Sequence, residues 1–207
     1  METVRSPFID WGAAGLSLAG ETRSGDAYVV KTWEKRFLAA VIDGLGHGNQ
    51  AADAAAVAAG ILTGPAPNPD DLVSLMSQCH ESLLRTRGVV LSLALFDAAN
   101  HAMTWLGVGN VEGLLFHAAP QANPARESLL RRGGVVGYQM PPLRPSTIPV
   151  SRGDLLIFST DGIRSGFEKE VNPEIAPRQI ADMILENYRK KEDDALVLVV
   201  RYTGGPP

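Results

Sequence analysis

The feature that most constrains this chain is an apolar segment that ends in an aspartate followed by a glycine-rich loop. Residues 38–42 predict a buried strand, Asp43 follows directly, and glycine occupies every second position of residues 44–48. Burying an ionised carboxylate costs several kcal/mol unless a cation or a set of backbone donors compensates it. Glycine tolerates positive φ and allows the backbone to approach a ligand closely. The segment therefore indicates either a ligand site or a tight strand-to-helix turn capped by Asp43.

Acidic residues also lie at the ends of other apolar segments. Each of them lies next to the beginning or the end of a predicted strand: Asp26, Asp161 and the pair Asp193-Asp194. If these strand ends come together in the fold, the carboxylates form one site. Hard divalent cations such as Mg²⁺ and Mn²⁺ prefer oxygen ligands of this kind.

Composition limits the classes of protein to consider. A chain of 207 residues, 45% of them hydrophobic, can bury one sizeable core, and we expect a single domain over residues 1–207. The net charge of -4 argues against nucleic acid as a partner. Cys79 is the only cysteine, which excludes an internal disulfide. The first ten residues lack an apolar signal region, and no segment approaches the roughly 20 apolar residues that cross a bilayer. We expect a cytoplasmic protein without a membrane partner.

Hydrophobic periodicity predicts a mixed fold in which strands dominate. Strands are predicted at residues 14–19, 27–33, 37–42, 89–96, 102–108, 112–116, 155–159 and 195–202, with short ones at 128–131 and 147–150. Helices are predicted at residues 51–62, from about 68 to 87, and from 177 to 188. Helices grouped after the third strand and near the end indicate an α+β fold, in which two mainly antiparallel sheets pack as a sandwich with the helices outside.

The order of the acidic motifs resembles the PPM family of metal-dependent protein serine/threonine phosphatases. The motifs are Gly-Asp, Val-Ile-Asp-Gly-Leu-Gly-His-Gly, Ser-Thr-Asp-Gly-Ile, and Asp-Asp before a last apolar strand. They are most similar to the bacterial branch that acts in sigma-factor stress signalling, and the resemblance runs from about residue 16 to residue 201. It implies a four-layer α-β-β-α sandwich and a Mn²⁺ or Mg²⁺ cofactor of two ions. It also implies phosphorylated STAS-domain regulators of a stressosome-type complex as substrates.

The resemblance also implies roles for individual residues. Asp43 would bridge the two metals, with the Gly44 carbonyl completing one coordination shell and Asp161 and Asp193 the other. Asp193 is favoured over its neighbour because the family's ligand is the first residue of the acidic pair. Asp26 would hold metal-bound waters as an outer-shell ligand, with an ordinary turn carboxylate as the alternative. Two metal ions can activate a water for phosphomonoester hydrolysis, so no protein nucleophile is required.

Some positions depart from the family pattern. His47 could protonate the leaving oxygen, because imidazole titrates near neutrality. The acid proposed for eukaryotic members directly follows the Asp-Gly pair, however, and that position here is Leu45, so His47 is also a candidate for orienting the loop. Leu196 replaces a threonine of the bacterial Asp-Asp-x-Thr signature. Arg23 is the nearest candidate for a phosphate-binding arginine, but its register matches poorly and a solvated turn residue is the alternative.

Two other functions are alternatives to phosphatase activity. A dinucleotide-binding loop would need a third glycine where Asn49 stands, and the lysine of a phosphate-binding loop is missing. The other alternative is a catalytically weak phosphatase-fold module that binds phosphorylated partners. Retention of all the core carboxylates argues against it, because a binding module gains nothing from a costly acidic cluster.

Overall fold

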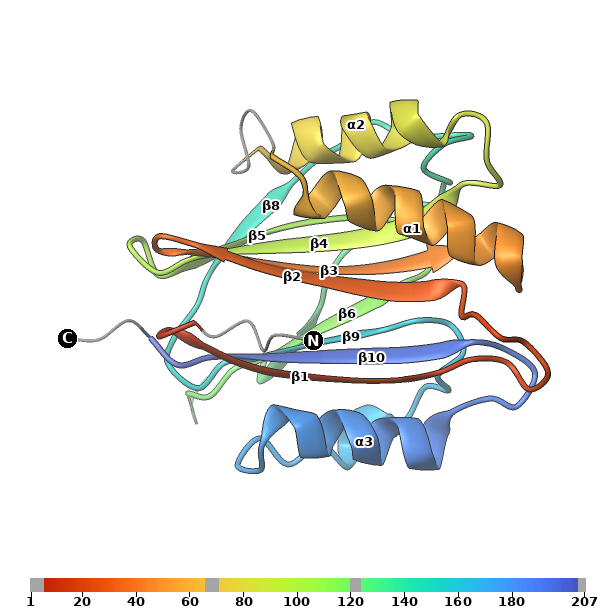
Figure 1. Cartoon of the computed structure of the whole chain (residues 1–207). Coiled ribbons are helices and arrows are strands. Elements are labelled where there is room, and N and C mark those ends of the chain that lie inside the picture. The colour runs from red at the N-terminus through yellow and green to blue at the C-terminus, as the bar shows by residue number, and fades with distance from the viewer. Residues whose placement is uncertain (1–5, 66–70, 120–123, 205–207) are drawn as a thin grey trace.

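Two antiparallel sheets face each other, and helices cover their outer faces (Figure 1). The computed structural model describes residues 6–65, 71–119 and 124–204. Within these residues, one five-stranded sheet has the order β1 (Ile9–Leu16), β10 (Ala195–Tyr202), β9 (Leu155–Ser159), β6 (Glu112–Phe116), β7 (Arg126–Ser128). The other has the order β2 (Asp26–Trp33), β3 (Arg36–Gly44), β4 (Val89–Asp97), β5 (Ala102–Val108), β8 (Ser146–Pro149). This arrangement confirms the predicted α-β-β-α sandwich.

The central strands are continuously apolar because both of their faces are buried. In β3, alternate residues Phe37, Ala39 and Val41 face the layer between the two sheets, while the residues between them pack against the helices. Strand residues alternate between faces with a period of two, so a strand that is covered on both sides has no polar face. The next residue on the inter-sheet face is Asp43, which places its carboxylate at the end of the layer between the sheets.

Helices α1 (Asn49–Thr63) and α2 (Leu72–Leu83) cover the sheet that contains β2, β3, β4, β5 and β8. Helix α3 (Pro177–Tyr188) covers the other sheet (Figure 1). A short 3₁₀ turn, η1 (Phe167–Lys169), precedes α3. The side chain of Asp71 caps α2 by accepting hydrogen bonds from the backbone N–H groups of Val73 and Ser74. The predicted start of this helix at residues 68–70 lies outside the described residues, and the helix ends at Leu83 rather than near residue 87. No helix in the described ranges has the length and apolar character needed to cross a bilayer.

The first strand differs from the prediction. β1 begins five residues earlier than expected and ends at Leu16, because its pairing with β10 extends back to Ile9. The backbone N–H of Leu18 then donates to the carboxylate of Asp194 at 2.7 Å instead of continuing a ladder. An inter-element hydrogen bond thus ends the strand where the apolar pattern would have continued it.

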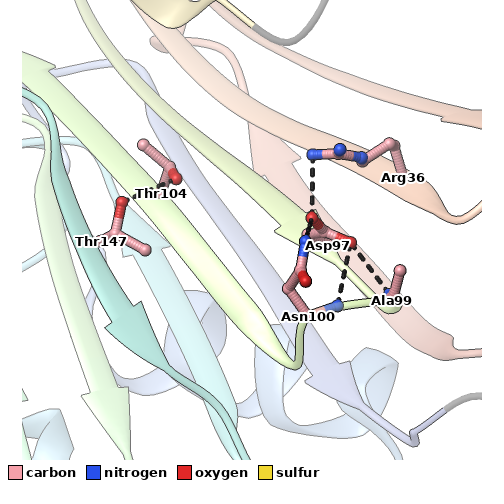
Figure 2. A network of polar contacts seen from close by, with 6 residues as sticks. All are labelled: Arg36, Asp97, Ala99, Asn100, Thr104 and Thr147. Atoms are coloured by element: carbon pink, nitrogen blue, oxygen red, sulfur yellow. Dashed lines mark hydrogen bonds and ion pairs between the residues drawn. The ribbon is translucent and has the colours of Figure 1, made fainter.

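The region rich in glycine and proline contains two short strands that are displaced from the predicted ranges. β7 ends at Ser128, where the predicted strand began, and β8 ends one residue earlier than predicted. The Thr104 and Thr147 hydroxyls of β5 and β8 lie 3.1 Å apart across the pair (Figure 2). Cross-strand pairs such as this one stabilise a sheet edge.

Asp97 shows how a carboxylate at a strand end is stabilised by donors (Figure 2). It accepts hydrogen bonds from the backbone N–H groups of Ala99 and Asn100, and from the Asn100 side chain at 2.6 Å. The Arg36 guanidinium lies 3.1 Å away. Burial acts to raise the pKa of Asp97, but these donors and the Arg36 charge outweigh it and hold the pKa below its ordinary range.

Candidate metal centre

The first two carboxylates lie directly opposite each other on neighbouring strands. In the antiparallel pair β2–β3, Asp26 is the register partner of Asp43, so both side chains project from the same face at the end of the inter-sheet layer. Like charges placed directly opposite each other on two strands are destabilising. The arrangement therefore needs a proton or a cation between the two acids.

The pKa values of these acids reflect this arrangement. Burial, and then the charge of Asp26, raises the pKa of Asp43 to about 8. Burial likewise raises the pKa of Asp26 to about 7, although a hydrogen bond from Thr160 opposes the rise. Burial and then the charge of Asp161 raise the pKa of Asp193. In contrast to Asp97, the side chain of Asp43 accepts no hydrogen bond from any described residue.

The opposite sheet supplies the next carboxylate through the loop after β9. Thr160 connects the two sheets, because its hydroxyl donates to Asp26 at 2.7 Å and accepts from the backbone N–H of Leu196 at 2.9 Å. Asp161 follows and is exposed. The side-chain amide of Asn110, in the turn between β5 and β6, donates to the Oδ2 atom of Asp161 at 2.8 Å. Asp161 is thus turned toward a neutral donor at the rim of the site.

The two acids that precede β10, Asp193 and Asp194, lie in different environments. Asp194 is only 3% exposed, and its two carboxylate oxygens accept from the backbone N–H groups of Leu18 and Gly25, each at 2.7 Å. Asp193 is half-buried and lines the same pocket as Asp43. The structure therefore places the first acid of the pair at the site and gives the second acid a role in joining loops.

Three of the predicted ligands line one pocket of about 140 Å³: Asp43, Asp161 and Asp193. Asp26 lies next to them through its pairing with Asp43. Within the ranges that the structure describes, no three acidic, histidine or cysteine side chains are gathered closely enough to hold an ion as they stand. The possible ligands are all carboxylate oxygens, and their charges repel one another, which suits a hard divalent cation.

Two glycines allow the site to form because other chain segments cross directly over them. A Cβ atom on Gly44 would collide with the carbonyl oxygen of Ala51 at the start of α1. A Cβ atom on Gly162 would collide with the carbonyl oxygen of Asp194. The glycine after each aspartate therefore lets a helix or a neighbouring loop pack against the strand end that carries the acid.

His47 and Arg23 lie away from the pocket. The Nδ1 atom of His47 is 2.9 Å from a carboxylate oxygen of Glu21, and the histidine side chain is 63% exposed. The pocket is lined on this side by Leu45 and Gly46 instead. Arg23 pairs with Asp53 of α1 at 2.6 Å on the surface. The geometry favours loop anchoring for His47 and the solvated alternative for Arg23.

Sequence reasoning missed the residues that hold the acids. Asn110 stands in a Gly-Asn turn, which is ordinary turn chemistry and gives no sign that its amide reaches Asp161. Thr160 belongs to a quoted motif, but its contacts with Asp26 and Leu196 join segments that are far apart in the chain. Only the fold brings these partners together.

The sandwich with an acidic pocket between its sheets defines the class of protein: it is the fold of the metal-dependent protein phosphatases. The chain matches a crystal structure of RsbX in complex with magnesium with a TM-score of 0.84 and 20% identity, over 97% of this chain and 98% of that one. A chain solved in work on the bacterial stressosome matches with a TM-score of 0.84 and 29% identity, over 93% of this chain and 99% of that one.

The family follows from the sequence match. Residues 34–203 match the model of the Stage II sporulation protein E (SpoIIE) family, and the chain belongs to this family. It is 26% identical over 150 residues to phosphoserine phosphatase RsbX of Bacillus subtilis (strain 168), which covers 72% of this chain and 71% of that protein. The resemblance predicted from the four acidic motifs is confirmed.

Proposed function

We propose that this protein is a Mn²⁺- or Mg²⁺-dependent phosphoserine/phosphothreonine protein phosphatase. The observation that carries the proposal is the set of carboxylates at Asp26, Asp43, Asp161 and Asp193, which two sheets bring to one end of the layer between them. Raised pKa values at three of these acids indicate a site built to be compensated by cations. Family membership supports the same activity.

The proposed ligands follow the geometry of the pocket. Asp43 lines the pocket with Asp161 and Asp193, and it would hold the ions together with the adjacent Gly44 carbonyl. Asp161 and Asp193 would complete the ligand set, and Asp26, which lies opposite Asp43 on β2, would act as an outer-shell acceptor. When bound, the cations would supply Lewis acidity toward the phosphoryl group and would acidify a water molecule.

The chain's own groups would orient these ligands. Thr160 holds Asp26 by a hydrogen bond, and Asn110 holds Asp161 at the rim. His47 would anchor the glycine loop through Glu21. Cys79 has no part in the reaction, because burial raises the pKa of its thiol to about 12 and it lies on the buried face of α2.

The proposed substrates are phosphorylated regulators of the STAS-domain type within a bacterial stress-signalling complex. One relative is named a phosphoserine phosphatase, and a similar chain was solved in work on the stressosome. Both facts concern those proteins and support the same substrate class here.

The test is dephosphorylation of phosphorylated STAS-domain proteins and of a phosphoserine peptide, with Mn²⁺, with Mg²⁺ and with EDTA. We expect turnover with either metal and none with EDTA, and Asp161→Asn serves as the inactive control. Binding of the phosphoproteins without turnover in either metal would instead identify a catalytically weak binding module.

A further inference from the structure

A second, larger hollow adjoins the metal pocket. It has a volume of about 630 Å³ and shares Asn110 and Asp161 with the smaller pocket, so the two are continuous at the rim. Three basic side chains line it: Arg131, Arg164 and Lys190. We call this hollow the basic groove.

Two of the basic groups are held in place by backbone carbonyls. The Arg164 guanidinium donates to the carbonyl oxygens of Asn187 and Tyr188 at the end of α3, at 2.8 and 3.4 Å. Arg131 donates to the carbonyl oxygen of Asn110 at 2.6 Å. A guanidinium has five N–H donors, so each arginine keeps free donors in a fixed position. Preorganised donors lose little entropy when they bind a carboxylate.

The third basic group is available to a ligand. Lys190 is fixed by its backbone, whose N–H donates to the Gly162 carbonyl at 2.7 Å. Its side chain is exposed and makes no hydrogen bond or ion pair with any other residue in the described ranges. The ammonium lines the groove, and its charge acts on Asp193 of the adjoining metal pocket, whose pKa it acts to lower.

The charge balance of the groove differs from that of the whole chain. The protein carries a net charge of -4, yet three basic groups line the groove against Glu112 and the shared Asp161. In the proposed function Asp161 is engaged by a cation, which leaves Glu112 as the opposing acid among the lining residues. A local positive surface on an acidic protein attracts acidic partners selectively.

We propose that the basic groove binds acidic side chains that flank the phosphorylated residue of the substrate. The inference rests on the proposed function, because it takes the small pocket as the place of the phosphoryl group. A peptide whose phosphoserine enters that pocket would pass its neighbouring residues along the rim formed by Asn110 and Asp161. Carboxylates at those positions would meet the free donors of Arg131 and Arg164 and the ammonium of Lys190.

The test uses fluorescein-labelled peptides that carry a non-hydrolysable phosphonate analogue of phosphoserine, flanked on both sides by glutamate, alanine or lysine. Fluorescence anisotropy with the Mg²⁺-loaded protein at low salt should show the glutamate peptide binding about ten-fold more tightly than the alanine peptide, and the lysine peptide more weakly. Equal affinities for the three peptides would overturn the proposal.

Variants locate the effect. Lys190→Gln should remove much of the preference for glutamate, and Lys190→Glu should shift it toward the lysine peptide. Lys191→Gln is the matched control, because Lys191 is the neighbouring exposed lysine and does not line the groove. A preference that survives Lys190→Glu unchanged would place the acidic contacts elsewhere. Because binding is measured without turnover, an inactive protein that retains the preference contradicts only the proposed function.

Discussion

Carboxylates at strand ends fall into two kinds in this protein, and their donors distinguish them. Asp97 and Asp194 each accept two or more hydrogen bonds, so their charges are satisfied by the chain itself. Asp43 and Asp26 oppose each other across two strands, and burial raises the pKa of both. A sequence shows that an acid ends a strand, but the number of donors around it decides between a structural role and a ligand role.

We expect Asp43→Asn and Asp161→Asn to abolish turnover and leave the fold intact. Each change removes a ligand charge, and Asp43→Asn also removes the repulsion with Asp26. In EDTA, Asp43→Asn should therefore melt no lower than wild type. Rates at saturating Mn²⁺ and thermal melts check both points. A residual rate above about a tenth of wild type, which corresponds to a loss under roughly 1.4 kcal/mol, would contradict the ligand assignment.

Substitutions at Asp193 and Asp194 should have different effects, one on activity and the other on stability. Asp193→Asn should lose activity at unchanged stability, because Asp193 lines the pocket. Asp194→Asn should lose stability, because the amide cannot replace both charge-assisted bonds to Leu18 and Gly25, and such a bond contributes roughly 1.5–3 kcal/mol. Urea unfolding and kcat at saturating Mn²⁺ separate the two. The assignment is wrong if Asp194→Asn is the more damaging to kcat in folded protein.

The acids themselves could be predicted from the sequence, and the groups that orient them could not. The sequence pattern predicts Asp43 and Asp161 as site residues, because each follows an apolar segment and precedes a glycine. Asn110 and Glu21 are common turn and loop residues, and their contacts with Asp161 and His47 exist only after distant segments have packed together. The proposed ligands can therefore be found from the local sequence pattern, whereas their hydrogen-bond partners are set by the tertiary structure.

At the scale of elements, the loop after β9 joins the two sheets at the site. The Thr160 hydroxyl bonds to Asp26 on one side and to the backbone of β10 on the other. The predicted bounds agree with the structure for β5, β6, β9 and β10. β9 and β10 are mainly apolar because both of their faces are covered. The prediction failed at the N-terminal end of β1, where a long-range pairing with β10 decides the boundary.

Replacing this hydroxyl tests the connection between the sheets. Thr160→Val would leave the Leu196 N–H and one Asp26 oxygen without a partner, and an unsatisfied buried group costs roughly 1–3 kcal/mol. For a chain of this size the melting temperature should fall by about 2–4 °C for each kcal/mol. Thr160→Ser keeps the hydroxyl and is the control. Equal melting temperatures for the two variants would show that the hydroxyl does not stabilise the fold.

For the whole molecule, the acidic site makes stability depend on pH and metal. In the metal-free protein the pKa values of Asp26 and Asp43, about 7 and about 8, exceed the ordinary value of 3.8. Between these limits the folded state holds more protons than the unfolded state, so the free energy of unfolding decreases as pH rises from about 4 to about 8. Mn²⁺ must displace the same protons, and its affinity should therefore increase with pH through this range.

Urea unfolding in EDTA between pH 5 and pH 8.5 checks this prediction. His117, whose pKa is also raised, contributes a loss of stability in the same direction, since hydrogen bonds from its ring to Glu127 and Asp154 outweigh the effect of burial. The comparison with Asp43→Asn isolates the site, because this variant should show a flatter profile. Parallel profiles for wild type and variant would rule out the acidic pair as the source.

The position of β10 also affects how the protein is made. It is the last described strand in the chain, yet it lies between β1 and β9 in its sheet, with β1 as its partner on one side (Figure 1). During synthesis β1 leaves the ribosome well before β10, and it remains unpaired until β10 has followed. Its apolar face and open edge are exposed for that interval, and exposed apolar surface with unpaired strand edges favours aggregation.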